Sequence, residues 1–186
     1  MIANRLHLNC AVAALFSTLV FLTAADADEA ELEALFEGLR GEDPVAATQI
    51  EARIYDIWSK SGSPSMDLLL DRGRTALNEG DARLAIEHFS ALIDHAPEFA
   101  EGYNARATAF FQDGRYGLAL DDIRKTLALN PRHFGALTGL AFILEEVGNP
   151  EDALAAWREV EALHPHIEGL KDAIARLERQ VEGAKL

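Results

Sequence analysis

A repeat of 34 residues is the feature of this sequence that most limits how it can fold. Prolines recur at that spacing, at Pro97, Pro131 and Pro165. Three further columns keep the same period: glycine at Gly80, Gly114 and Gly148, alanine at Ala85, Ala119 and Ala153, and a large apolar residue at Phe89, Ile123 and Trp157. A fixed period of this length is typical of a solenoid, in which each unit buries its core against its neighbours.

The spacing of apolar residues within each repeat predicts two short antiparallel helices. In the first repeat, apolar and small residues form one helical stripe over 69–77 and a second over 84–93. Gly80 can adopt the left-handed conformation that ends the first helix, and Pro97 has no N–H to continue the second. The small residues Gly73 and Ala85 allow the two helix axes to approach closely.

These columns resemble the tetratricopeptide repeat (TPR) family, in three tandem copies over residues 66–165. Small residues at Gly73, Ala107 and Ala141 and a tyrosine at Tyr116 also fit that family, whereas Leu69, Tyr103 and Leu137 stand where it often has tryptophan. The whole chain is similar to uncharacterised exported TPR proteins of Gram-negative bacteria. The resemblance implies an all-α fold, a right-handed α-solenoid of three helix hairpins with repeats at 66–99, 100–133 and 134–167.

A solenoid must cover its two apolar ends, and helical patterns flank the repeats on both sides. Residues 28–65 predict an N-terminal helical hairpin that caps the first repeat, joined to it by the serine, glycine and proline residues of 61–65. Residues 168–186 predict a C-terminal capping helix whose apolar face consists of Leu170, Ile174, Leu177 and Val181.

The first 27 residues have the layout of a secretory signal peptide. One base, Arg5, precedes an uncharged apolar stretch over 10–22, and Ala25-Asp26-Ala27 supplies a small-residue exit. We expect cleavage after Ala27, which places the remaining chain in the periplasm without membrane insertion. An uncleaved inner-membrane anchor is the alternative, because the uncharged span from Leu6 to Ala25 has the length of about 20 residues that crosses a bilayer. Both alternatives keep the repeats outside the cytosol.

Charge and cysteine content exclude several classes of function. The formal net charge is -14, from 31 acidic and 17 basic residues, and the bases are not clustered, so nucleic-acid binding is not expected. The single cysteine, Cys10, lies inside the predicted signal peptide. The mature chain therefore has no thiol for a disulfide, a cysteine nucleophile or a thiolate metal site.

No group of residues has the spacing of a catalytic, cofactor or metal site. His164 and His166 flank a proline and, with Glu168, lack a fourth metal ligand. Pro131-Arg132-His133 falls where two helix hairpins join, so we interpret it as a turn rather than a catalytic pair. An enzyme is not expected, and an unrecognised hydrolase is kept only as a remote alternative.

The TPR resemblance implies a concave groove lined by the first helices of successive repeats. In the first helix of each repeat, this face lies one residue further round than the stripe that packs on the second helix. The predicted partner-binding residues on it are Leu70, Arg74, Leu77, Asn104, Thr108, Phe111, Thr138 and Phe142. Phe111 and Phe142 would hold an apolar side chain, or alternatively pack between repeats. Arg74 would bind an acidic group. Some family members clamp a terminal carboxylate with lysines, but Leu70 and Gly135 stand at those positions, so recognition of acidic chaperone tails is not implied.

The function predicted from these features is that of an exported scaffold or adaptor that binds a peptide or protein in its groove. The alternative is a structural protein that self-associates into a homo-oligomer and has no separate ligand.

Overall fold

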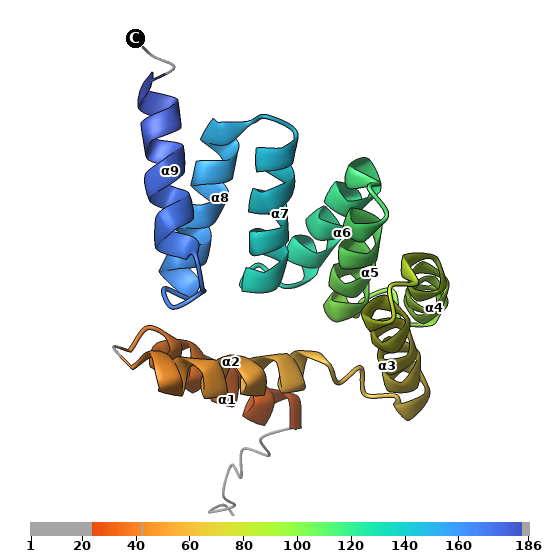
Figure 1. Ribbon diagram of the computed structural model, residues 1–186. Helices are drawn as coiled ribbons and strands as arrows, with labels where there is room; N and C mark the ends of the chain where they lie inside the picture. Colours follow the sequence, from red (N-terminus) through yellow and green to blue (C-terminus); the bar gives the residue numbers. More distant parts are fainter. Residues whose placement is uncertain (1–23, 42, 184–186) are drawn as a thin grey trace, which may run out of the picture.

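The computed structural model describes residues 24–41 and 43–183, and every regular element in these ranges is an α-helix. Residues 1–23 of the signal peptide predicted over residues 1–27 lie outside the described residues. The helices are α1 (Ala24–Leu39), α2 (Pro44–Trp58), α3 (Pro64–Asn78), α4 (Ala82–His95), α5 (Ala100–Gln112), α6 (Tyr116–Leu129), α7 (Phe134–Glu146), α8 (Pro150–Leu163) and α9 (Leu170–Gly183) (Figure 1). Within the described ranges, none of these helices combines the length and apolar character needed to span a membrane.

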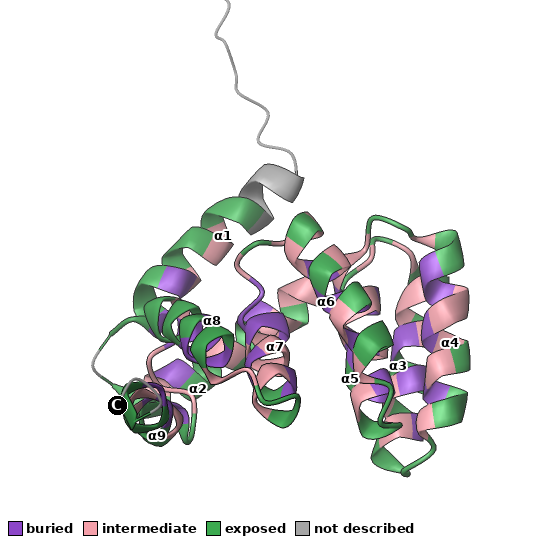
Figure 2. Ribbon diagram, turned by 90° about the horizontal axis from the view of Figure 1, so that it is seen from above, coloured by how far each residue is buried: buried purple, intermediate pink, exposed green. Residues whose placement is uncertain are grey.

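Helices α3 to α8 form the three predicted hairpins and stack into a solenoid. Figure 2 shows the buried residues gathered where neighbouring helices meet. Gly80, Gly114 and Gly148 end the first helix of each hairpin with φ of 82°, 73° and 77°, a conformation that favours glycine. The predicted helical solenoid is therefore confirmed.

The small-residue columns lie at the contacts between paired helices, as predicted. Ala85, Ala119 and Ala153 are each 0% exposed. A Cβ added at Gly73 would overlap the ring of Phe89 in the paired helix. The 34-residue period therefore reports the close packing inside each hairpin.

Helix α9 covers the C-terminal end of the solenoid. Its apolar face, Leu170, Ile174, Leu177 and Val181, is buried against Trp157 and Val160 of α8. This placement agrees with the predicted capping helix.

The N-terminal hairpin, α1 and α2, does not cap the first repeat, and that part of the prediction is wrong. Phe36, Leu39 and Ile54 instead form a core with Phe134, the first residue of α7. The hairpin crosses below the solenoid in Figure 1. The outer face of the first repeat consequently keeps Leu68 and Leu84 at 48% and 40% exposure.

Candidate functional site

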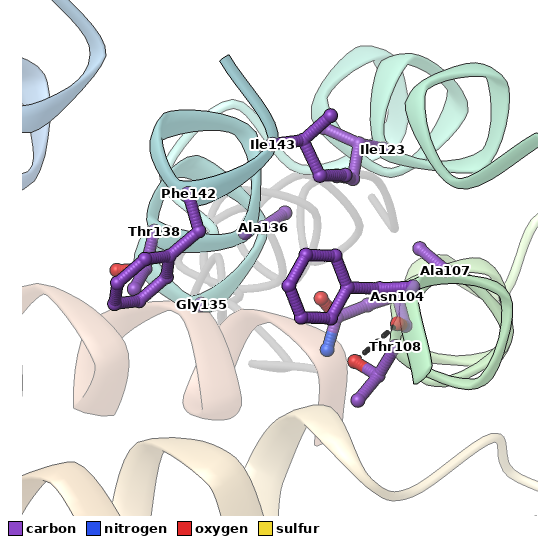
Figure 3. A pocket seen from close by; sticks show the side chains of 11 residues that line it. Asn104, Ala107, Thr108, Ile123, Gly135, Ala136, Thr138, Phe142 and Ile143 are labelled. Carbon is purple, nitrogen blue, oxygen red and sulfur yellow. Dashed lines mark hydrogen bonds between the residues drawn. The ribbon is translucent and has the colours of Figure 1, made fainter. Parts of the chain in front are cut away.

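A cavity of about 220 Å³ opens between α5 and α7, the first helices of the second and third repeats. The predicted groove residues from these two helices, Asn104, Thr108, Phe111, Thr138 and Phe142, all line it. In Figure 3, Asn104 and Thr108 project from α5, and Thr138 and Phe142 project from α7. The structure thus brings the predicted residues of the second and third repeats together.

Small residues make this cavity possible. Ala107, Gly135, Ala136 and Gly139 form much of its wall, so the two helices approach without long side chains between them. Ile123 and Ile143 add further apolar surface. The sequence prediction missed these wall residues because it selected one residue in each turn of helix, and small residues give no signal of lining a cavity.

The two phenylalanines of the site differ in exposure. Phe142 is 50% exposed, with its ring edge-on to Trp157 at 5.0 Å between centroids. Phe111 is partly buried in the core of the second repeat and lies 5.5 Å from the ring of Tyr116. Phe142 is therefore the more accessible apolar surface, while Phe111 both packs between helices and lines the cavity.

Most polar groups at the cavity are already engaged within the chain. The Asn104 side-chain amide donates to Glu101 at 3.1 Å, and the Thr108 hydroxyl donates to the backbone carbonyl of Asn104 at 3.1 Å. The Thr138 hydroxyl oxygen is buried and has no hydrogen-bond partner among the described residues. The cavity therefore favours an apolar group over a strongly polar one.

The predicted groove residues of the first repeat do not form an open site. Leu70 is 1% exposed and belongs to the core of the first two repeats, and Leu77 packs against the same core. Arg74 binds Glu101 at 2.6 Å and the Ser59 hydroxyl at 3.0 Å. The prediction that Arg74 is free to bind an acidic group is wrong, because Glu101 already neutralises the charge of Arg74.

Glu101 connects Arg74 to a buried histidine. Glu101 and His133 are 4% and 0% exposed, and their side chains meet at 2.9 Å. His133 Nδ1 accepts a hydrogen bond from the Ala136 N–H at 3.1 Å, so the ring proton is on Nε2, which donates a hydrogen bond to the Glu101 carboxylate. His133 also caps α7 through the same Nδ1 contact. The histidine of Pro131-Arg132-His133 therefore has a structural role.

The N-terminal hairpin covers this network and closes one end of the groove. The Trp58 ring stacks on His133 at 4.3 Å, and the Tyr55 hydroxyl lies against Gly135. Burial, with a smaller effect of Glu101, raises the pKa of Tyr55 well above its usual range. The cavity itself is lined by residues of α5, α6 and α7 and by none of α2.

Arg132 fixes α1 to the turn before α7. Its guanidinium binds Glu33 at 2.7 Å and Glu29 at 3.1 Å, and it lies 4.6 Å from the centroid of the Phe36 ring. These contacts explain why an arginine stands in this turn, and they involve no substrate or cofactor.

His164 and His166 also hold the hairpin. His164 meets Glu51 at 3.2 Å, and His166 Nε2 contacts the carbonyl of Gly41. Burial lowers the pKa of His164, and the hydrogen bond to Glu51 opposes that shift. Within the described ranges, no group of three or more His, Cys, Asp or Glu residues is placed to hold a metal ion.

Comparisons with known proteins agree with this architecture. The tetratricopeptide repeat profile matches residues 70–134 and 105–166. A TPR repeat-containing protein of Rhizobium etli is 33% identical over 161 residues, covering 86% of this chain and 79% of that protein. Small glutamine-rich tetratricopeptide repeat-containing protein 2 of Saccharomyces cerevisiae is 29% identical over 139 residues, covering 75% of this chain and 38% of that protein.

Two solved structures share the fold. The first TPR of Spaghetti (RPAP3), bound to an HSP90 peptide, superposes with a TM-score of 0.60 at 19% identity, covering 63% of this chain and 93% of that one. The MamA protein superposes with a TM-score of 0.59 at 18% identity, covering 86% of this chain and 84% of that one.

Proposed function

Because the chain belongs to the tetratricopeptide repeat family, we propose that it is an exported scaffold that holds an extended segment of a partner protein between α5 and α7. The observation that carries the proposal is the apolar cavity in which Phe111 and Phe142 meet Asn104, Thr108 and Thr138. A bulky apolar side chain of the partner enters this cavity. The HSP90 peptide bound to the Spaghetti repeat supports peptide binding by a scaffold of this fold.

The partner's chain approaches from the side that the hairpin leaves open. Tyr55 and Trp58 fill the end of the groove next to His133 and Gly135. Arg74 already forms an ion pair with Glu101, so a carboxylate of the partner does not bind there. The recognition that we propose at this cavity is therefore apolar, with an acidic group excluded from the Arg74 end.

Phe142→Ala tests the proposal. Truncation of a fully buried phenylalanine costs about 3–5 kcal/mol, and Phe142 is half exposed, so we expect a loss of stability of no more than about 2 kcal/mol. As an anchor at the centre of the interface, the same side chain should contribute about 2 kcal/mol or more to binding. A tagged copy purified from the periplasm identifies the partner by mass spectrometry, and titration calorimetry then measures its affinity.

Val147→Ala is the matched control, because Val147 is also exposed (54%) and terminates α7 but does not line the cavity. This control should retain the partner. Equal affinities of the Phe142 and Val147 variants would contradict the proposed site.

The uncovered outer face of the first repeat favours self-association as a second candidate function. A hollow of about 380 Å³ there is lined by the exposed Leu68 and Leu84 and also by the charged residues Asp71, Arg72 and Glu79. Leu84→Lys should then shift the molar mass measured by light scattering from oligomer to monomer. A wild-type chain that stays monomeric across a range of concentrations would eliminate this candidate.

A further inference from the structure

Helix α9 continues the 34-residue register of the groove. Thr138 and Phe142 are the predicted groove residues of the third repeat, and Glu145 lies one turn further along α7; one period later come Asp172, Arg176 and Arg179. The apolar face of α9 is buried against α8, so these three residues lie on another face. The capping helix is thus also the first helix of an incomplete fourth repeat.

A hollow of about 550 Å³ confirms that this face of α9 borders the groove. Asp172, Arg176 and Arg179 line it together with Phe142 of α7 and Trp157 of α8. Phe142 also lines the cavity between α5 and α7. The two hollows therefore lie on either side of one shared residue, the exposed Phe142, and an extended chain that passes over its ring can reach both.

The two cations of this second hollow differ, because Arg176 is paired with a carboxylate, as Arg74 is, and Arg179 is not. Arg176 is 53% exposed and binds Glu145 at 2.6 Å, and Glu145 also accepts the Trp157 Nε1–H at 2.7 Å. Arg179 is exposed and forms no ion pair with any residue that the structure describes. Both guanidinium groups line the hollow, one turn apart on α9, and Arg179 is the one that can bind a new carboxylate without displacing Glu145.

Acidic residues at the hollow restrict where a negative group can bind. Glu168 and Asp172 also line it, near the first turn of α9, where the helix dipole favours acids. Arg176 and Arg179 lie in later turns. The charge pattern therefore repels a carboxylate at one end of the hollow and attracts it at the other.

We infer that the partner segment carries an acidic side chain that binds Arg179, next to the apolar side chain held between Phe111 and Phe142. The apolar cavity between α5 and α7 and the cation on α9 are separated by one to two helix spacings of about 8–10 Å each, and an extended chain advances about 3.3 Å per residue, so the acidic residue follows or precedes the apolar anchor by about three to six residues. This inference rests on the proposed peptide-binding function and adds the chemistry of the second contact.

Selection from a library of random short peptides displayed on phage tests the inference on the full mature chain. The wild-type chain should enrich peptides that combine a bulky apolar residue with an aspartate or glutamate at the stated separation. The Arg179→Gln variant should still select the apolar residue but lose the acidic one. Arg158→Gln, which removes an exposed cation on α8 outside both hollows, should select the same peptides as wild type.

Fluorescence anisotropy with one selected peptide then measures the contribution of the ion pair. Hydrogen bonds between charged groups are stronger than those between neutral groups, so Arg179→Gln should weaken binding about tenfold. Replacing the acidic residue of the peptide by its amide should weaken binding by the same factor. When the Arg179→Gln variant binds the amide peptide, the two losses of binding free energy should not add.

The outcomes separate this inference from the proposed function. Peptides with an apolar anchor but without a preferred acid, or affinities that Arg179→Gln leaves unchanged, would overturn the inference and leave the apolar site intact. A wild-type chain that enriches no peptide, or whose selected peptides bind Phe142→Ala unchanged, would overturn the proposed function and this inference with it.

Discussion

Ala119 is fully buried between the two helices of the second repeat, in a core with Phe110 and Ile123. Replacing it by leucine adds methyl groups where no space exists, so Ala119→Leu should lower the free energy of unfolding by about 1–3 kcal/mol. Ala128→Leu is the control, because Ala128 lies on the exposed side of the same helix. Equal denaturant midpoints for the two variants would show that the alanine column does not mark the helix contact.

His164 should make stability depend on pH. The residue is 1% exposed and its Nδ1 has no hydrogen-bond partner among the described residues, and burial lowers its pKa below the usual value of 6.5. As pH falls through that value, the unfolded chain gains a proton before the folded chain does. The stability that neutral His164 contributes is therefore complete above this pH and is lost below it.

Chemical denaturation of wild type and His164→Gln between about pH 8 and about pH 5 checks this prediction. The wild-type chain should lose more stability than the variant over this interval. An identical decrease in both proteins would assign the pH dependence to other groups, since Glu51 and His166 remain in both.

The sequence predicted residue roles that depend on local spacing and missed those that depend on distant partners. The alanine column follows from the repeat alone, because each alanine packs inside its own hairpin. Arg74 was predicted to be free because its partner, Glu101, lies 27 residues away on another helix. Only the three-dimensional arrangement shows that this charge is already neutralised.

At the scale of the elements, the N-terminal hairpin was predicted as two helices but assigned to the wrong surface. An amphipathic pattern shows that a face must be covered and does not identify the surface that covers it. The aromatic rings of Tyr55 and Trp58 pack on His133 and Phe134 instead of on the first repeat. These ring contacts, and not proximity in sequence, determine the position of the hairpin.

Gly135 permits the approach of this hairpin and provides a test of it. A Cβ at residue 135 would overlap the Tyr55 hydroxyl, so Gly135→Ala should lower the free energy of unfolding by about 1–3 kcal/mol despite the better helix propensity of alanine. Tyr55→Phe removes the overlapping oxygen, and the double variant should recover most of the lost stability. Thermal unfolding measures both effects.

Gly139→Ala on the same helix supplies the control. A Cβ there would lie 3.5 Å from Ile123, an ordinary van der Waals contact, so this variant should be neutral or stabilising. If Gly135→Ala were equally well tolerated, or if Tyr55→Phe gave no recovery, the hairpin would not pack against α7 as described.

At the scale of the whole molecule, the solenoid was predictable because its contacts join sequence neighbours. Each repeat packs on the next, so a short period in the sequence contains the information for the array. The hairpin instead docks through contacts such as that of Arg132 with Glu29, which are 103 residues apart. The candidate site was predictable in its second and third repeats and not at the end where the hairpin closes the groove.

Cleavage of the signal peptide determines which residues the exported molecule contains. Small residues at Ala25 and Ala27 fit a signal-peptidase site, so the exported protein should begin at Asp28. The described side-chain contacts of α1 start at Glu29, which binds Arg132, and continue through Phe36 and Leu39 in the hairpin core. Cleavage at this point therefore leaves the docked hairpin with all of these contacts.

N-terminal sequencing of the protein from the periplasmic fraction checks the site of cleavage. Ala27→Leu should block processing, because a large residue does not fit the position before the cleaved bond, and the unprocessed chain should then remain with the membrane. The conservative variant Ala27→Ser should be processed as wild type. Recovery of the intact wild-type chain from the membrane fraction would instead establish that the uncharged segment over residues 6–25 is an uncleaved anchor, with the repeats tethered to the bilayer beside it.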